Sequence, residues 1–405
     1  MANQKKKKKW IRFRHKLVTR IAYCIMYPIS RIKYGVTIKK FKEQEKRPYL
    51  VLLNHQTPYD QFFVGMSFKG TLYYLATEDI FSKGWISALI KFLVAPIPIK
   101  KQTTDVSAIL NCLRVAKEGG SIVIAPEGNR TYSGRTEYMS PSIVALARKL
   151  GLPVALYRIE GGYGAQPRWS DVVRRGKMLC YVSRVIQPEE YKEMDDDSFF
   201  AAIRDGLYVN EAVADATFRH KKLAEYMERA IYVCPDCGPA HFMSKNDILE
   251  CTSCHKKVRY LPTKELRGEG FELPFRFVAD WYDYQADYVN STDMTALTDE
   301  PIFLDRAAIW NVIPCKGRTR VMKSASLRLY GNRVEIDAPE GQLHLPFDEL
   351  SAVAVLGRNK LNLYHGDKLY QVKGDKRFNA LKYVHIYHRY KNIRKGEEHV
   401  KFLGL

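Results

Sequence analysis

The stretch Leu50-Val-Leu-Leu-Asn-His-Gln-Thr-Pro-Tyr-Asp60 decides how this chain of 405 residues is interpreted. Its apolar start predicts a buried strand. Thr57 suits the N-cap of a following helix, and Pro58 suits the first helical position, where no amide is needed. The turn between strand and helix lets the carboxylate of Asp60 fold back toward His55. A histidine oriented by an aspartate can take a proton from a hydroxyl, so the pair is a candidate general base.

A simpler interpretation of the same residues is structural. Asp60 lies three residues after Thr57 and would complete a capping box there, and His55 would be an ordinary loop histidine.

A second motif favours the catalytic interpretation. Ser121-Ile-Val-Ile-Ala-Pro-Glu-Gly-Asn-Arg130 is another apolar strand, and it runs straight into a polar loop. Without the first motif, Glu127 and Arg130 would be interpreted as a local ion pair. Polar loops at the ends of two buried strands are how the sites of α/β proteins are assembled.

Together the two motifs resemble those of the phospholipid/glycerol acyltransferase family, which includes lysophosphatidic acid acyltransferases. That family carries a His, four residues and then an Asp, which His55 and Asp60 match. It also carries a Glu-Gly-Thr-Arg block, and the resemblance covers roughly the first half of the chain. The residues that correspond to this block are Glu127, Gly128, Asn129 (in place of Thr) and Arg130.

The resemblance implies a role for each of these positions. His55 would deprotonate the acceptor hydroxyl, with Asp60 holding it in position. Glu127 and Arg130 would grip the phosphate region of the acceptor. Asn129 keeps a polar side chain but lacks the branch of threonine, so the resemblance specifies the reaction more closely than the acceptor.

A third candidate for the acceptor site lies between the two motifs. Trp85 to Val94 predicts an apolar helix, buried or else facing lipid beside an acyl tunnel. The prolines of Ala95-Pro-Ile-Pro-Ile-Lys-Lys101 then predict an extended edge segment. In the family, a basic residue at the end of the equivalent segment helps to hold the phosphate. Lys100 is the candidate here, and the alternative is a solvated pair of surface lysines.

Alternation of strands and helices gives the fold class of the first part. Strands at 121–125 and 153–159 are separated by a helix that Gly151 ends, and helices are expected over 195–218 and 220–232. This spacing predicts an α/β layer with a mixed, mostly parallel sheet, as the resemblance to glycerolipid acyltransferases also implies.

Four of the eight cysteines form two Cys-X-X-Cys pairs with thirteen residues between them. This spacing predicts a tetrahedral thiolate site for structural zinc, since four ligands leave no open position. His241 or His255 would be a substitute ligand, and Cys-Thr-Ser-Cys-His also fits a haem attachment pattern, which the second cysteine pair argues against. The expected ligands are Cys234, Cys237, Cys251 and Cys254.

Alternating apolar residues dominate the last hundred residues. Gly331-Asn332 and Gly366-Asp367 predict hairpin turns between such runs, and 378–390 predicts a final helix. A small antiparallel β-barrel closed by a helix resembles the pleckstrin-homology-like superfold, a likeness of architecture that carries little functional information.

The N-terminal region is strongly basic. Lys5 to Lys9 are consecutive lysines, and 10–26 predicts an amphipathic helix that Pro28 ends, with Phe13, Leu17 and Ile21 on its apolar side. Such a helix is typical of an interfacial membrane anchor. The alternative is a helix packed on the catalytic domain with a solvated lysine tail. No secretory signal and no apolar run long enough to span a membrane is expected.

The net charge indicates which class of partner the protein binds. Lys and Arg total 65 against 44 acids, a formal charge of +21, which favours an anionic partner. No nucleic-acid-binding motif accompanies this charge, so an anionic membrane surface is favoured over nucleic acid. The expected location is cytoplasmic, on the inner face of a membrane.

The sequence therefore predicts an O-acyltransferase. It would move a fatty acyl group from acyl-CoA or acyl carrier protein to a lysophospholipid, 1-acylglycerol-3-phosphate, and give phosphatidic acid. The competing hypothesis is an inactive membrane- or nucleic-acid-binding scaffold that uses the zinc ribbon and the β domain. The expected parts are an interfacial helix (1–28), an acyltransferase domain (29–230), a zinc ribbon (231–262), a helical linker (263–300) and a pleckstrin-homology-like β domain (301–405).

Overall fold

The computed structural model describes residues 9–42, 48–77, 80–81, 85–99, 105–313 and 317–404. Their contacts divide the chain into two compact units, and the chain passes between the units several times. The first unit consists of Met1–Asn129, Thr136–Glu160 and Met178–Val209. The second consists of Arg130–Arg135, Gly161–Lys177 and Asn210–Leu405.

The first unit is built on a seven-stranded sheet with the order β1-β7-β6-β2-β5-β3-β4. All neighbours pair in parallel except β6 and β7. The predicted mixed, mostly parallel α/β sheet is therefore confirmed. Its strands are β1 (Val36–Ile38), β2 (Leu50–Leu53), β3 (Leu72–Thr77), β4 (Ile97–Ile99), β5 (Ser121–Ile124), β6 (Val154–Glu160) and β7 (Met178–Ile186).

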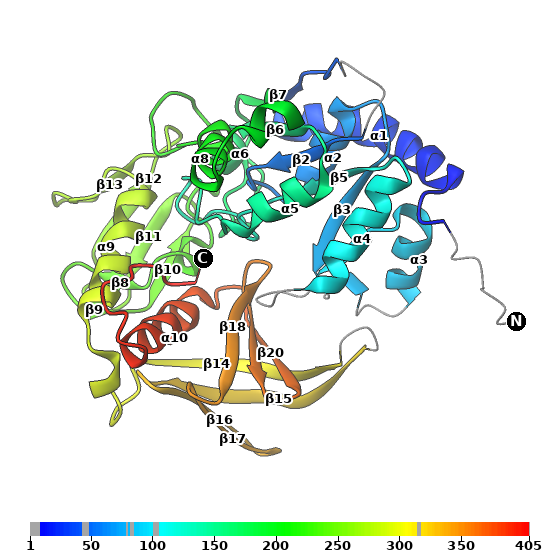
Figure 1. The fold of residues 1–405 in the computed structure, drawn as a ribbon. Coiled ribbons are helices and arrows are strands. Elements are labelled where there is room, and N and C mark those ends of the chain that lie inside the picture. Colours follow the sequence, from blue (N-terminus) through cyan, green and yellow to red (C-terminus); the bar gives the residue numbers. More distant parts are fainter. Residues whose placement is uncertain are drawn as a thin grey trace, which may run out of the picture. The chain divides into compact units, whose positions relative to one another are not determined.

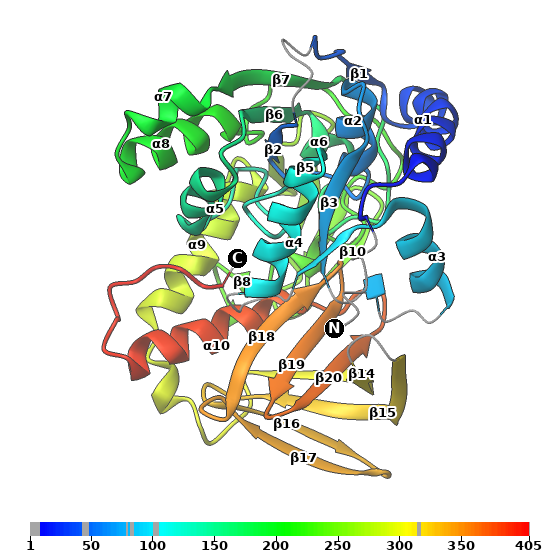
Figure 2. The same cartoon turned by 45° about the vertical axis from the view of Figure 1, so that its right-hand side comes forward.

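Helices cover both faces of this sheet. Figure 2 shows α1 and α2 on one side of the strands and α4, α5 and α8 on the other. Strand β2 is buried along its whole length, as strands covered on both faces are. The helices of this unit are α1 (Phe13–Tyr34), α2 (Asp60–Ser67), α3 (Trp85–Val94), α4 (Val106–Lys117), α5 (Ser142–Leu150), α7 (Pro188–Lys192) and α8 (Asp196–Leu207).

Helix α1 differs from its prediction in length. It runs through Pro28 and ends at Gly35, which adopts the left-handed conformation common at helix ends. Its buried side chains are polar or amphipathic ones such as His15 and Thr19, and the apolar side faces outward. Helix α3 also exposes Trp85 and Phe92, so burial, the first of its two predicted environments, is wrong. No helix among the described residues is both long and apolar enough to cross a membrane.

The first half of the second unit is poor in regular structure up to its cysteine-rich part. The helix expected over 220–232 is absent there, and only the short 3₁₀ turn Met227–Arg229 forms. A four-stranded antiparallel sheet follows, with the order β10-β11-β12-β13, beside the pair β8–β9. These elements are α6 (Gly162–Ala165), β8 (Val233–Cys234), β9 (Gly238–Pro239), β10 (Phe242–Lys245), β11 (Ile248–Cys251), β12 (Lys257–Tyr260), β13 (Leu266–Gly268) and α9 (Val278–Ser291).

The C-terminal part is a seven-stranded antiparallel sheet with the order β17-β16-β15-β14-β20-β19-β18 (Figure 1). Both predicted hairpin turns are present, and α10 packs against β18. The sheet is a half-barrel and not the expected closed barrel, because β17 and β18 form its two edges. Its elements are β14 (Phe303–Ile313), β15 (Gly317–Leu329), β16 (Arg333–Ala338), β17 (Gly341–Pro346), β18 (Leu350–Leu356), β19 (Lys360–His365), β20 (Lys368–Gly374) and α10 (Leu381–Arg394).

Candidate active site

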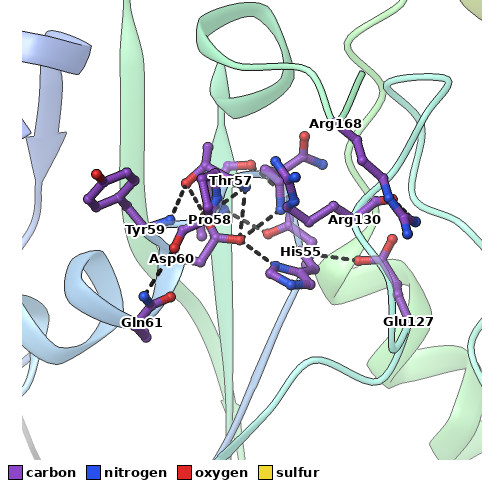
Figure 3. A network of polar contacts seen from close by, with 12 residues as sticks. His55, Thr57, Pro58, Tyr59, Asp60, Gln61, Glu127, Arg130 and Arg168 are labelled. Atoms are coloured by element: carbon purple, nitrogen blue, oxygen red, sulfur yellow. Dashed lines mark hydrogen bonds and ion pairs between the residues drawn. The ribbon is translucent and has the colours of Figure 1, made fainter. Parts of the chain in front are cut away.

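The end of strand β2 carries the histidine–aspartate pair. His55 lies in the turn after β2, and Asp60 is the first residue of α2. The Nδ1 atom of His55 lies 2.8 Å from Oδ2 of Asp60 (Figure 3). The aspartate is 1% exposed, whereas 30% of the histidine side chain remains accessible. The structure therefore brings the two predicted dyad residues into direct contact.

Asp60 is fixed by more than the histidine. Its carboxylate accepts hydrogen bonds from the backbone N–H of Gln56 at 2.8 Å and of Thr57 at 2.9 Å. The hydroxyl of Thr57 donates to it as well, at 2.6 Å. The same carboxylate thus organises the turn and contacts His55, so the structural and catalytic interpretations describe one arrangement. Helix α2 has Tyr59 at its N-cap, so Thr57 and Pro58 lie in the turn before the helix.

This geometry fixes the chemistry available to the imidazole. A neutral His55 that donates its Nδ1 hydrogen to the carboxylate carries its lone pair on Nε2. Asp60 also stabilises the positive charge that develops when Nε2 takes a proton. A histidine oriented in this way by a buried carboxylate can act as a general base.

Glu127 ties the two polar loops together. Its Oε1 accepts the backbone N–H of His55 at 2.8 Å (Figure 3), and its Oε2 accepts that of Glu137 at 2.9 Å. Burial above all, and the carboxylates of Glu137 and Asp60 to a smaller extent, raise the pKa of Glu127 to about 8, against the opposing effect of these two N–H donors. Both oxygens of this side chain are thus engaged by the protein backbone.

The other residues of the second motif come directly after Glu127 in the chain. Gly128 has a φ of 67°, in the left-handed region that glycine adopts without strain, and its N–H closes a turn onto Ala125. Asn129 is the last residue before the chain enters the second unit, and Arg130 is the first residue within it. Arg130 is buried, and its carbonyl accepts a hydrogen bond from Arg168 at 3.0 Å. Lys100 lies outside the described residues.

Asn54, for which no role was predicted, supports the site in the structure. Its amide group exchanges two hydrogen bonds with the backbone of Ile159 in β6, at 2.9 and 2.8 Å. The side chain is fully buried and couples the end of β2 to the neighbouring strand. A polar residue at the end of an apolar strand was the signal that could have identified it.

A second candidate site is formed by the four cysteines of the second unit. Their sulfur atoms all lie within 4.8 Å of one another, and those of Cys234 and Cys254 are 3.8 Å apart. Tetrahedral zinc with Zn–S bonds of about 2.3 Å requires sulfur–sulfur distances of about 3.8 Å. The four thiol groups therefore fit a tetrahedral metal ion, and the structure brings all four predicted ligands, Cys234, Cys237, Cys251 and Cys254, together.

Comparison with known proteins gives the context of these sites. A family model described as Acyltransferase matches residues 35–158, the segment that contains both polar loops. The chain is 24% identical over 146 residues to the chloroplastic 1-acyl-sn-glycerol-3-phosphate acyltransferase of Brassica napus. The matched region covers 34% of this chain and 41% of that protein. It is 21% identical over 136 residues to the 1-acyl-sn-glycerol-3-phosphate acyltransferase of Bacillus subtilis, covering 34% of this chain and 65% of the relative.

Among solved structures, the chain is similar to the 1-acyl-sn-glycerophosphate acyltransferase from Thermotoga maritima. The identity is 18%, with 48% of this chain and 76% of that chain covered and a TM-score of 0.37. The chain thus spans less than two thirds of each of the two curated relatives, and the similarity to them is confined to about a third of its own length.

Proposed function

Residues 35–158 form an acyltransferase-family domain, and from this premise we propose that the protein is an O-acyltransferase acting on lysophospholipids. The acceptor is 1-acylglycerol-3-phosphate and the product phosphatidic acid. The acyl donor is a thioester of coenzyme A or of acyl carrier protein. The observation that carries the proposal is the 2.8 Å hydrogen bond between His55 and the buried Asp60, because it leaves a basic nitrogen on an accessible imidazole.

The reaction follows from this base. Nε2 of His55 takes the proton of the acceptor hydroxyl as the oxygen attacks the thioester carbonyl. A C–O bond forms, and the tetrahedral intermediate then collapses with cleavage of the C–S bond. The departing thiolate receives the proton from the imidazolium, which returns the base to its starting state. Asp60 stabilises the imidazolium during the step and holds the ring in one orientation.

Arg130 supplies the positive charge for the acceptor phosphate in this proposal. A guanidinium offers two parallel N–H groups to a phosphate, which an ammonium group does not. Both oxygens of Glu127 are occupied by backbone N–H groups, so Glu127 contributes indirectly. Its hydrogen bonds to the N–H groups of His55 and Glu137 hold the loop that precedes Arg130. Lys100 completes the proposed acceptor site, as the family resemblance implies.

The four-cysteine site fits structural zinc. Thiolates are the ligands that zinc prefers in closed tetrahedral sites, and four of them leave no position for substrate. The metal would hold the turn after β8 against the end of β11, through Cys234, Cys237, Cys251 and Cys254. The metal would therefore stabilise the fold and take no part in acyl transfer. Together with the half-barrel and α10, we assign this region to a zinc ribbon followed by a pleckstrin-homology-like domain.

We further propose that the protein binds peripherally to an anionic membrane, on its inner face. Helix α1 exposes apolar side chains at intervals of three or four residues, together with the basic residues Arg12, Lys16 and Arg20. A helix with such a composition lies in the interface with its apolar side in the lipid. The side chains that follow this spacing are Phe13, Leu17, Ile21, Ile25, Ile29 and Ile32.

Acyl transfer by the purified protein tests the central proposal. Lysophosphatidic acid is offered with each of the two thioester donors, and the wild type is compared with His55→Ala. His344→Ala is the matched control, because His344 is an exposed histidine in strand β17. We expect transfer by the wild type and the control and a loss of about 10²- to 10⁴-fold in His55→Ala. Failure of the wild type with a panel of lysophospholipids would overturn the proposed function and favour a non-catalytic scaffold.

A further inference from the structure

One buried arginine, Arg168, connects Arg130 of the second motif to the C-terminal half-barrel. Arg168 is 3% exposed, and its Nη1 donates to the carbonyl of Arg130 at 3.0 Å. Its Nε donates to the carbonyl of Gly357 at 3.2 Å. Gly357 lies in the turn between β18 and β19, so the guanidinium of Arg168 joins Arg130 to this turn. Figure 3 shows Arg168 beside Arg130.

The neighbourhood of Arg168 is itself held by the half-barrel. Asp171 pairs with Arg358 at 2.9 Å and with Arg229 at 2.7 Å. Arg229 also donates to the carbonyls of Trp169 and Lys376, at 2.9 and 2.6 Å. Residues 168–171 are thus fastened to the turn after β18 and to the segment that links β20 with α10. Movement of either would displace Arg168.

The loop after Arg130 is closed on itself. The hydroxyl of Thr131 accepts the N–H groups of Ser133 and Gly134, at 3.1 and 2.9 Å. Arg135, at its far end, pairs with Asp280 at 3.2 Å and also with Asp283, both in α9. Because the turn is tight, a displacement of one end of the loop also displaces the other end. The hydrogen bond from Arg168 to the carbonyl of Arg130 therefore holds the first residue of this loop in place.

We propose that Arg168 is a positioning residue through which the C-terminal half-barrel holds Arg130 in its working conformation. The half-barrel thereby contributes to acceptor binding without touching the acceptor. An arginine suits this part because its planar fork directs N–H groups at two carbonyls at fixed angles, and the ring of Tyr132 packs against it at 4.5 Å. This inference rests on the proposed function of Arg130, but its structural half can be tested without turnover.

The test compares Arg168→Gln with a matched control, Arg389→Gln. Arg389 is 6% exposed, and it too donates from Nε and Nη1 to two backbone carbonyls, at 3.2 and 3.0 Å, those of Thr292 and Glu398. Loss of a buried arginine therefore costs each variant similar contacts. Amide hydrogen exchange across 131–135 reports the loop, and steady-state kinetics report the Michaelis constants of acceptor and donor separately.

We expect faster exchange across 131–135 in Arg168→Gln and not in Arg389→Gln. The acceptor KM should rise about 10-fold in Arg168→Gln, with the donor KM within about twofold, because only the acceptor site is displaced. In the background of Arg130→Gln, removal of Arg168 should add less than about twofold, since residues that act through one another are not additive. Arg168→Lys should recover part of the effect.

Three results would overturn the inference. Unchanged exchange in Arg168→Gln would show that Arg168 does not hold the loop, whether or not the protein is active. Faster exchange without any rise in acceptor KM would show that the loop does not position Arg130. Full additivity with Arg130→Gln would place the two residues in independent roles. A wild type that transfers no acyl group would instead defeat the proposed function, and the exchange rates would still decide whether Arg168 restrains the loop.

Discussion

Asp60 accepts the Nδ1 hydrogen of His55 at 2.8 Å with the same oxygen that accepts the backbone N–H of Gln56 at 2.8 Å. The proposed catalytic contact and the fold of the turn therefore share one atom. A substitution at this aspartate must disturb both, whereas a substitution at the partly exposed histidine disturbs mainly the chemistry.

Asp60→Asn separates these two contributions by comparison with His55→Ala. The amide nitrogen of an asparagine would face N–H donors, so we expect a loss of about 1–3 kcal/mol in the free energy of unfolding. His55→Ala should change this free energy by less than about 1 kcal/mol, since its side chain is partly exposed. Both variants should lose acyl transfer. Urea unfolding beside initial rates measures the two effects, and equal stability losses in the two variants would contradict the shared-atom argument.

Glu127 predicts a pH dependence of stability with a definite sign. Burial raises its pKa to about 8 from an ordinary value of 4.5, so the folded protein holds a proton that the unfolded chain has released. The free energy of unfolding should therefore be highest, relative to Glu127→Gln, below pH 4.5 and should fall as the pH rises to about 8. Above that pH the difference between the two proteins should be constant.

Urea unfolding of wild type and Glu127→Gln from about pH 5 to about pH 9 measures this difference. Glu189→Gln, on the exposed side of α7, is the control for loss of a surface carboxylate. A difference that stays flat over this range, or that rises with pH, would contradict the raised pKa.

The sequence was most informative where structure is local. The end of β2, the end of β5 and the left-handed Gly151 follow from apolar runs and from residue types that stop them. The helix start was placed at Pro58, two residues too early: the hydroxyl of Thr57 accepts the N–H of Tyr59 and donates to Asp60, and these bonds form the turn that precedes the helix. Both motifs of the candidate site were found in this way.

The features that local sequence patterns could not predict are those that depend on contacts between residues far apart in the chain. The bonds of Arg168 join residues 38 and 189 positions apart, and nothing near Arg168 in the sequence signals either partner. The helix expected over 220–232 fails for a related reason, since Tyr226 has a φ of 72° and Arg229 is committed to Asp171. The pattern of α1 predicted two faces but left open whether the apolar one packs on the domain or points outward, and the structure has it pointing outward.

The cysteine site predicts a dependence of folding on metal. The purified protein should contain one zinc per chain, and Cys237→Ser or Cys251→Ser should lower that content. Structural zinc is worth about 10–16 kcal/mol in isolated zinc-finger peptides, so chelation should lower Tm or expose the surrounding core. Elemental analysis and thermal unfolding measure both effects, with Cys24→Ser as the control, since Cys24 is exposed and remote in sequence from the cluster. Full zinc content in Cys237→Ser would contradict the proposed ligand set.

The exposed apolar side of α1 predicts binding to lipid. The double variant Ile21→Gln and Ile25→Gln should weaken binding to vesicles of anionic phospholipid at least about 10-fold, because burial of an isoleucine contributes about 1.5–3 kcal/mol. Both side chains are more than half exposed, at 53% and 56%, so the fold should be unaffected. Vesicle co-sedimentation measures the affinity, and circular dichroism checks the fold.

Leu304→Gln is the matched control for this experiment, because Leu304 is 57% exposed but lies in β14 and not in α1. It should bind vesicles as the wild type does. Binding of the wild type should also fall as salt is raised, since the basic residues beside the apolar stripe contribute about 1 kcal/mol each near an anionic surface. A double variant that binds as tightly as Leu304→Gln would show that α1 is not the membrane-binding element, even if the protein binds lipid elsewhere.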